Sequence, residues 1–137
     1  MLITERMWIL RFILEKTIMP SNTLPTINKL AEQTTAALEE LKAEKIKVYN
    51  VTGKISYADC IIICNVNSLV QARAAADRIQ KLYKNNNIKL KNQQKHSDIS
   101  SWNIIDSGDL IVHIFLKQAR DYYDIDAIFT NLQRRDK

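Results

Sequence analysis

One run of five apolar residues constrains the fold more than any other feature of this sequence. It reads Cys-Ile-Ile-Ile-Cys over residues 60–64, and Asp59 precedes it directly. A strand that is apolar at every position is typical of a strand buried on both faces of its sheet. The run therefore predicts a central strand at residues 59–64, covered by other elements on both sides.

Length and composition fit a single domain with one core. The chain has 137 residues, of which 46% are hydrophobic, and folding at this size removes roughly 65–70% of the unfolded chain's surface from water. Only 2 glycines are present, which excludes a glycine-rich phosphate-binding loop. The 2 cysteines are too few for a disulfide framework and belong to the apolar run. They predict small core residues in a reducing, cytoplasmic compartment.

Hydrophobic periodicity and alternation predict the elements around this strand. The expected elements are a helix at residues 26–44 capped by Thr26, a strand at 46–51, a helix at 68–84 capped by Ser68, and a short strand at 88–91. A strand at 59–64, then a helix, then a strand at 88–91 predict a parallel pair joined by a right-handed crossover.

A β-hairpin follows. Two strand-like runs, Trp102–Asp106 and Asp109–Leu116, are joined by Ser107-Gly108, and a two-residue turn containing glycine is a strong hairpin signal. A hairpin adds an antiparallel pair to the expected parallel one. The fold class predicted is therefore α/β, with a mixed β-sheet of about five strands flanked by helices.

The hairpin also predicts which side chains share a face of the sheet. With Ser107-Gly108 as the whole loop, the expected cross-strand pairs are Asp106 with Asp109, Ile104 with Ile111, and Trp102 with His113. These six share one face because side chains alternate, and the other face is nearly all apolar and belongs in the core. A tryptophan beside isoleucines and acids is typical of a protein–protein hot spot. The alternative is that a helix covers this face and His113 is an ordinary buried residue.

An acidic and aromatic segment, residues 120–126, lies just downstream of the hairpin. One of its adjacent tyrosines, Tyr122 and Tyr123, is expected in the core and the other outside. Asp124 or Asp126 is expected to cap the final helix, since aspartate is a preferred residue at that position.

Charge is distributed unevenly along the chain, although its sum is only +5. Residues 98–126 hold six aspartates against one lysine and one arginine, which favours a basic partner. Residues 78–95 hold six lysines and arginines and no acid. Two interpretations of this basic stretch stay open: a solvated helix face, or direct RNA contact through Arg78, Lys81 and Lys84.

Residues 1–25 are expected to form an N-terminal extension before a domain at residues 26–137. Charged residues interrupt the apolar part of this extension, so we expect neither the ~18–20 apolar residues of a membrane span nor a secretory signal. We expect an extra docked helix there, or a true start at Met7 or Met19.

A divalent-metal site is the best enzymatic hypothesis. Asp106, Asp109 and His113 would place carboxylates near an imidazole, a set that suits Mn²⁺ or Mg²⁺ and could serve phosphotransfer or hydrolysis. Zinc would have to use Cys60, Cys64, His96 and His113, and both cysteines look like core residues. The residues alone leave two interpretations open: a binding protein without cofactor, metal or catalytic residues, and a metal-dependent enzyme as the alternative.

Several motifs, taken in order, resemble those of one family. They are Leu41–Ile46, Gly53–Asp59, Ala74–Asp77, Trp102–Phe115 and Arg120–Ile125. The series Trp…Asp-x-Gly-Asp…Val-His-x-Phe…Arg-x-Tyr-Tyr-Asp is quite specific. From about Leu30 to Phe129 the chain resembles the ribosomal silencing factors, also called the Iojap-like family.

This resemblance implies a nucleotidyltransferase-like fold without the catalytic motif. It also implies a translational repressor that binds the large ribosomal subunit through its fourteenth ribosomal protein. Occupying that surface would prevent the small subunit from joining and would damp translation when nutrients are scarce. Members of the family can self-associate, so a homodimer is one expected form. The contact residues implied by position are Tyr57, Asp59, Trp102, Asp106, Asp109, His113, Tyr122, Tyr123 and Asp124.

Three segments depart from the usual pattern of the family, one of them the loop before Trp102, where Asp98 is the only acidic residue. Residues 66–70 lack the glycine and the arginine that usually precede the second helix, and Ile128-Phe129 stands where Leu-Trp is typical. These departures concern the contacts of the second helix.

Overall fold

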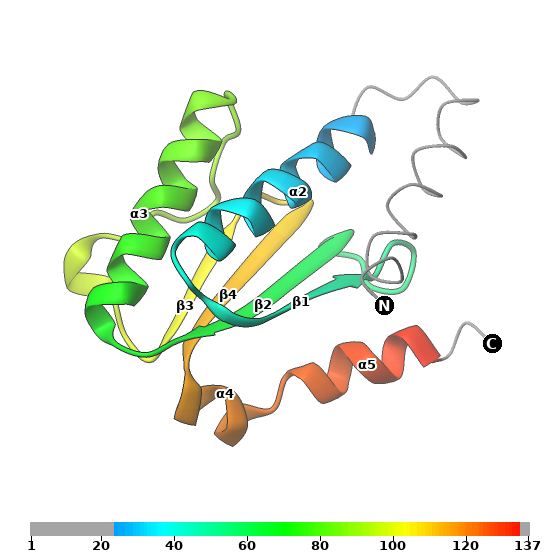
Figure 1. Cartoon of the computed structure of the whole chain (residues 1–137). Helices are drawn as coiled ribbons and strands as arrows, with labels where there is room; N and C mark the ends of the chain where they lie inside the picture. Colours follow the sequence, from blue (N-terminus) through cyan, green and yellow to red (C-terminus); the bar gives the residue numbers. More distant parts are fainter. Residues whose placement is uncertain (1–23, 135–137) are drawn as a thin grey trace.

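The computed structural model describes residues 24–134, which are built around one mixed four-stranded sheet with the order β1-β2-β4-β3 (Figure 1). The strands are β1 (Glu44–Asn50), β2 (Cys60–Val66), β3 (Trp102–Asp106) and β4 (Leu110–Leu116). β2 and β4 are parallel at the centre, and β1 and β3 are antiparallel edge strands. The predicted fold class is confirmed, with four strands where about five were expected. Most of the expected N-terminal extension, including Met7 and Met19, lies outside the described residues.

β2 is the central strand that the apolar run predicts, and all its residues are buried. Cys60, Ile62 and Cys64 face one side of the sheet, and Ile61 and Ile63 face the other, so the strand contributes to two separate cores. Both cysteines are free and buried, as predicted. Burial raises the pKa of each thiol to about 12.

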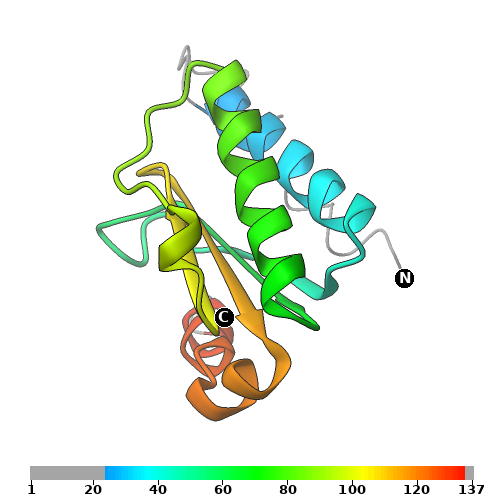
Figure 2. The same cartoon turned by 90° about the vertical axis from the view of Figure 1, so that its left-hand side faces the viewer.

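Two helices, α2 (Leu24–Glu40) and α3 (Leu69–Asn85), lie side by side over one face of the sheet (Figures 1 and 2). Ser68 caps α3 as predicted, because its hydroxyl oxygen accepts a hydrogen bond from the backbone N–H of Gln71 at 3.1 Å. α2 begins two residues before the predicted Thr26, which lies inside the helix and is not its cap. Hydroxyls of Thr34 and Tyr83, 2.9 Å apart, join the two helices in the core.

Helices α4 (Lys117–Tyr123) and α5 (Asp126–Arg134) lie on the other side of the sheet (Figures 1 and 2). Ile125 and Phe129 pack in a second core with Tyr49 of β1 and Ile61 of β2. Because α5 packs toward β1, side chains of β3 such as Ile104 on this face are only partly buried. No helix among residues 24–134 is long and apolar enough to cross a membrane.

The β3–β4 hairpin forms, but its predicted register is wrong. The observed pairs are Trp102 with Phe115, Ile104 with His113, and Asp106 with Ile111. Asp109 therefore lies in the loop and does not oppose Asp106. The cause is the neighbouring strand: the Asp109 carbonyl accepts from the N–H groups of Asp59 and Cys60 at 2.9 and 3.0 Å, which aligns β4 with β2. The shift spans two positions, so the side chains that lie in the two strands stay on their predicted faces.

Residues 88–91 do not form the predicted strand. The chain passes instead along the outer edge of β3, where Lys91 N–H donates to the Asp106 carbonyl at 2.7 Å. Asn92 continues this edge with its side chain, which accepts from Asp106 N–H at 2.9 Å and donates to the Ile104 carbonyl at 2.7 Å. The short 3₁₀ helix η1 (His96–Asp98) follows. The parallel pair is consequently β2 with β4, and its crossover contains both α3 and β3.

Candidate protein-binding surface

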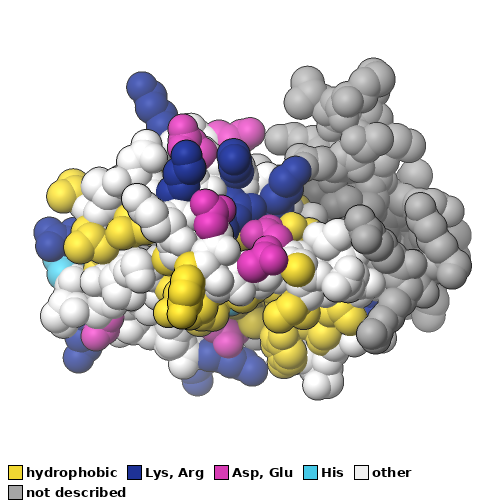
Figure 3. Space-filling view, turned by 90° about the horizontal axis from the view of Figure 1, so that it is seen from below, with side chains coloured by type: hydrophobic (Ala, Val, Ile, Leu, Met, Phe, Trp, Pro, Cys, Tyr) yellow, Lys and Arg dark blue, Asp and Glu magenta, His cyan; other side chains and the backbone are white. Residues whose placement is uncertain are grey.

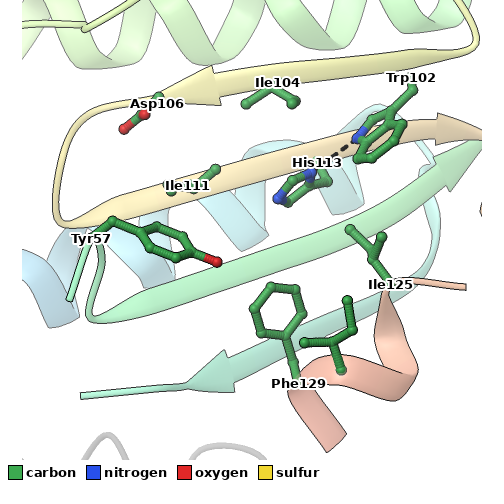
Figure 4. Close-up of a pocket in the computed structure, with 9 residues that line it drawn as sticks. Tyr57, Trp102, Ile104, Asp106, Ile111, His113, Ile125 and Phe129 are labelled. Atoms are coloured by element: carbon green, nitrogen blue, oxygen red, sulfur yellow. Dashed lines mark hydrogen bonds between the residues drawn. The ribbon is translucent and has the colours of Figure 1, made fainter. Parts of the chain in front are cut away.

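An open pocket of about 400 Å³ lies on the sheet face that carries α4 and α5 (Figure 4). Its floor comes from β3 and β4, one wall comes from the start of α5, and Tyr57 approaches from the segment before β2. Nine residues line it: Tyr57, Trp102, Ile104, Asp106, Ile111, His113, Ile125, Ile128 and Phe129. The pocket thus brings together four of the predicted contact residues, Tyr57, Trp102, Asp106 and His113.

Trp102 and His113 are joined inside this pocket. The indole Nε1–H of Trp102 donates to Nδ1 of His113 at 3.0 Å (Figure 4). His113 is only 9% exposed, and burial lowers its pKa to about 4, although the charges of Asp106 and Asp126 act in the opposite direction. His113 is therefore buried and neutral at pH 7, as the alternative interpretation supposed. An open pocket, rather than a covering helix, lies beside it.

Trp102 also lies at the centre of an aromatic cluster. Its ring stacks on Phe115 with centroids 5.0 Å apart and is 4.7 Å from the ring of Tyr123. Tyr122 meets Tyr123 edge-on at 5.1 Å. Tyr123 is 49% exposed and Tyr122 is 81% exposed, so the prediction that one tyrosine would enter the core is wrong. The inward-facing residue of α4 is Arg120 instead.

Sequence reasoning missed the network that Arg120 makes. Its guanidinium donates to the carboxylate of Asp126 at 3.0 and 3.1 Å, to the Lys45 carbonyl at 2.6 Å and to Oδ1 of Asn65 at 2.8 Å. The hydroxyl of Tyr49 donates to the same carboxylate at 2.6 Å. Partial burial would raise the pKa of Asp126, but these hydrogen bonds outweigh it and hold that pKa below its usual value. The network fixes the start of α5, and with it one wall of the pocket.

Asp124 and Asp126 lie just before and at the start of α5, but they contribute there in other ways than the predicted side-chain cap. Asp126 is the first residue of α5, where a carboxylate interacts favourably with the helix dipole, but its side chain bonds to Arg120 and Tyr49. Asp124 ends α4 with a left-handed φ of 48°. Its carbonyl, rather than its side chain, accepts from Ala127 N–H at 3.3 Å.

The underside of the molecule combines apolar and charged side chains. Figure 3 shows hydrophobic groups gathered over α4 and α5, with side chains of both charges beside them. The exposed large hydrophobic residues on these helices are Tyr122, Tyr123 and Ile128. Such a mixture of aromatic and charged groups is suited to contact with another protein.

A family model described as "Ribosomal silencing factor during starvation" matches residues 24–137. The chain belongs to this family. It is 32% identical to the ribosomal silencing factor RsfS of Halalkalibacterium halodurans over 68% of this chain and 79% of that protein. It is 33% identical to RsfS of Bacillus subtilis over 69% of this chain and 79% of that protein. A crystal structure of a Chromobacterium violaceum protein superposes with a TM-score of 0.70 at 28% identity, covering 76% of this chain and 86% of the other.

Membership of the ribosomal silencing factor family confirms the resemblance drawn from the motifs. The description of the family is that of a regulatory factor. Five contact residues that the resemblance implies do not line the pocket: Asp59, Asp109, Tyr122, Tyr123 and Asp124. Asp59 is partly buried before β2, whereas Asp109 and Asp124 are exposed in the hairpin loop and at the end of α4. Their role in binding stays a prediction.

The metal-site hypothesis is not supported by the geometry. Among residues 24–134, no three His, Cys, Asp or Glu side chains are placed to hold a metal ion. Oδ1 of Asp106 accepts from Gly108 N–H at 2.8 Å, Nδ1 of His113 is occupied by Trp102, and Asp109 lies in the loop. The predicted set of metal ligands is wrong because it assumed a two-residue turn that would place Asp109 opposite Asp106.

The basic residues singled out for RNA contact lie on α3, across the sheet from the pocket. Lys81 and Lys84 are exposed, and Arg78 forms an ion pair with Glu40 of α2. Direct contact with RNA stays a prediction.

Proposed function

We propose that this chain represses translation by binding the large ribosomal subunit through its fourteenth ribosomal protein and blocking the small subunit from joining. One observation carries the proposal: in a member of the silencing factor family, Trp102 and its aromatic neighbours border an open, mostly apolar pocket on a partly covered sheet face. We call the pocket together with Tyr122 and Tyr123 the binding face.

The chemistry of the binding face suits a basic protein partner. Asp106 is the one charged residue among the nine that line the pocket, since His113 is neutral at pH 7. Residues 98–126, which supply most of this face, hold six aspartates against two cations. Ribosomal proteins are generally basic, so the attraction is complementary.

Obstruction of subunit joining requires affinity and bulk, with no chemical step. A dissociation constant between micromolar and nanomolar corresponds to about −8 to −12 kcal/mol. A few aromatic anchors in well-packed pockets can supply most of such a binding energy. The site residues proposed to contribute are those predicted from the family resemblance, with Trp102, Tyr57 and Tyr123 at the centre.

Co-sedimentation tests the first half of the proposal and a joining assay tests the second. The purified chain should pellet with salt-washed large subunits, and it should slow their association with small subunits in light scattering. Large subunits lacking the fourteenth protein should not bind it. Equal binding to those particles would assign the contact to RNA or to another protein, and binding without slower joining would overturn the blocking mechanism.

A further inference from the structure

Resting on the proposed function, we infer that the pocket is the anchor site for the partner. It takes an aliphatic side chain that neighbours a lysine or arginine on the partner's surface. His113 donates a hydrogen bond from Nε2 to a backbone carbonyl of the same partner segment. The inference names two polar groups in a mostly apolar pocket, the Nε2–H of His113 and the carboxylate of Asp106, and it states the chemistry of the partner segment that they bind.

The hydrogen bond from Trp102 determines which nitrogen of His113 carries the proton. Indole N–H groups only donate, so Nδ1 of His113, 3.0 Å away, must accept and cannot hold a proton. In a neutral imidazole the proton then lies on Nε2. Figure 4 shows the edge of the ring that bears Nε2 turned away from Trp102, toward the space between Ile111 and Tyr57. The pocket therefore presents a neutral donor at its base, and a partner needs an acceptor there.

The walls of the pocket select an apolar group. Four isoleucines and Phe129 line it together with the rings of Tyr57 and Trp102. Its volume of about 400 Å³ falls at the lower end of the roughly 300–1,000 Å³ found for ligand sites. That space suits an aliphatic side chain and a short stretch of its backbone. A carbonyl is the acceptor that such a segment always carries.

Asp106 adds a preference for a cation beside that anchor. The Gly108 N–H, 2.8 Å away, holds Oδ1 of Asp106 and orients the carboxylate. An ionised carboxylate can accept about four hydrogen bonds, so capacity remains for a lysine or arginine of the partner. No lysine or arginine is among the residues that line the pocket to compete for it. An apolar residue next to a basic one is thus the segment that the pocket fits.

The experiment measures the affinity of labelled variants of the full chain for salt-washed large subunits. His113→Gln keeps an N–H donor at the ε position, whereas His113→Leu keeps the approximate size and removes the donor. We expect the leucine variant to bind about tenfold more weakly and the glutamine variant to stay within about threefold of the wild type. Ile128→Arg adds bulk and positive charge at the pocket, and it should also weaken binding about tenfold. Its matched control is Val70→Arg, because Val70 is 78% exposed and Ile128 is 56% exposed, and Val70 lies on α3 across the sheet.

Nuclear magnetic resonance of the free chain provides a measurement that does not depend on binding. The ¹⁵N shifts of His113 at pH 7 should show the proton on Nε2. Trp102→Phe, which removes only the indole donor and some ring area, should allow the other tautomer to appear. A proton on Nδ1 in the wild type would overturn the inference directly.

The binding outcomes separate this inference from the proposed function. If the wild type binds and both His113→Leu and Ile128→Arg bind equally well, the anchor site is wrong while the proposed function stands. If the wild type does not bind large subunits, both proposals are wrong. A wild-type dimer that Ile128→Arg turns into a monomer, without loss of large-subunit affinity, would assign the pocket to a second copy of the chain and overturn the inference.

Discussion

Arg120 and Asp126 form a bidentate ion pair, with Nε–Oδ2 and Nη2–Oδ1 distances of 3.0 and 3.1 Å. The same guanidinium donates to the carbonyl of Lys45 and to the side chain of Asn65. One buried arginine of α4 therefore joins β1, β2 and α5. Because α5 supplies one wall of the pocket, the shape of the binding face depends on this residue.

Replacing Arg120 with methionine should lower the free energy of unfolding by about 2–4 kcal/mol. The substitution removes the guanidinium donor from Asn65 and Asp126 and leaves the Asp126 carboxylate with the hydroxyl of Tyr49. Removing one partner of a buried ion pair commonly costs roughly 3–5 kcal/mol. The carboxylate of Asp126 keeps some contact with water, since its side chain is 24% exposed, which reduces that cost. Urea denaturation followed by circular dichroism measures the change.

Lys117→Met is the matched control for this substitution, because Lys117 begins the same helix and is exposed. It should change the free energy of unfolding by less than about 0.5 kcal/mol. If the Arg120 variant is as stable as the Lys117 variant, the network of Arg120 makes no net contribution to the free energy of unfolding.

His113 should make the stability of the fold depend on pH between about 6.5 and 4. Its pKa falls from 6.5 to about 4 on folding because the ring is buried. In this range the unfolded chain binds a proton that the folded chain does not, so the stability is complete above pH 6.5 and is lost as the pH falls toward 4. The loss can reach roughly 3 kcal/mol, taking about 1.4 kcal/mol for each pH unit. Protonation would also place an N–H at Nδ1 against the N–H of Trp102.

Denaturation curves of the wild type and of His113→Gln at several pH values measure this effect. The glutamine variant should lack most of the loss between pH 6.5 and 4. Asp126, whose folded pKa lies below its usual value, contributes stability that is lost at still lower pH. The same slope in both proteins between pH 6.5 and 4 would mean that His113 is not the titrating group.

Local patterns predicted those parts of the fold that depend on neighbouring residues in the chain. The apolar run marked β2, and Ser68 marked the start of α3. Alternation along the hairpin placed Trp102, Asp106 and His113 on one face, which is why these three predicted contact residues meet in the pocket. These features follow from short-range chemistry of strands, caps and turns.

The hairpin register, the direction of Arg120 and the position of α5 depend on contacts between residues far apart in the chain, which the sequence did not reveal. The hairpin register depends on the Asp109 carbonyl, which β2 uses to align β4. Arg120 points inward because its hydrogen-bond acceptors lie in β1, β2 and α5. The local sequence does not show these acceptors, so the prediction placed a tyrosine ring in the core instead of Arg120. Ile125 and Phe129 were not predicted as pocket residues for the same reason, because the position of α5 is set by that network.

Asn92→Ala should expose the edge of the sheet at β3. The side chain of Asn92 binds Asp106 N–H and the Ile104 carbonyl, so it substitutes for a neighbouring strand. Its loss should cost about 1–3 kcal/mol and should favour self-association, since an unpaired edge can pair with another chain. Sedimentation at increasing protein concentration measures the association. Gln93→Ala, at the exposed adjacent position, should remain like the wild type, and an Asn92 variant that matches it would contradict the edge-covering role.

The affinity for large subunits should fall as salt rises, and Asp106 should account for part of that dependence. Asp106→Asn keeps an oxygen that can accept from Gly108 N–H and removes only the negative charge that faces the pocket. Salt screens attraction between partly exposed charges, with a Debye length of about 10 Å at 0.1 M. The asparagine variant should therefore bind more weakly than the wild type at low salt, and the difference should narrow at high salt. Asp77→Asn, on α3 across the sheet, should leave the salt dependence unchanged. If both variants show the wild-type salt dependence, the charge of Asp106 does not take part in binding, and an apolar contact alone would have to hold the partner.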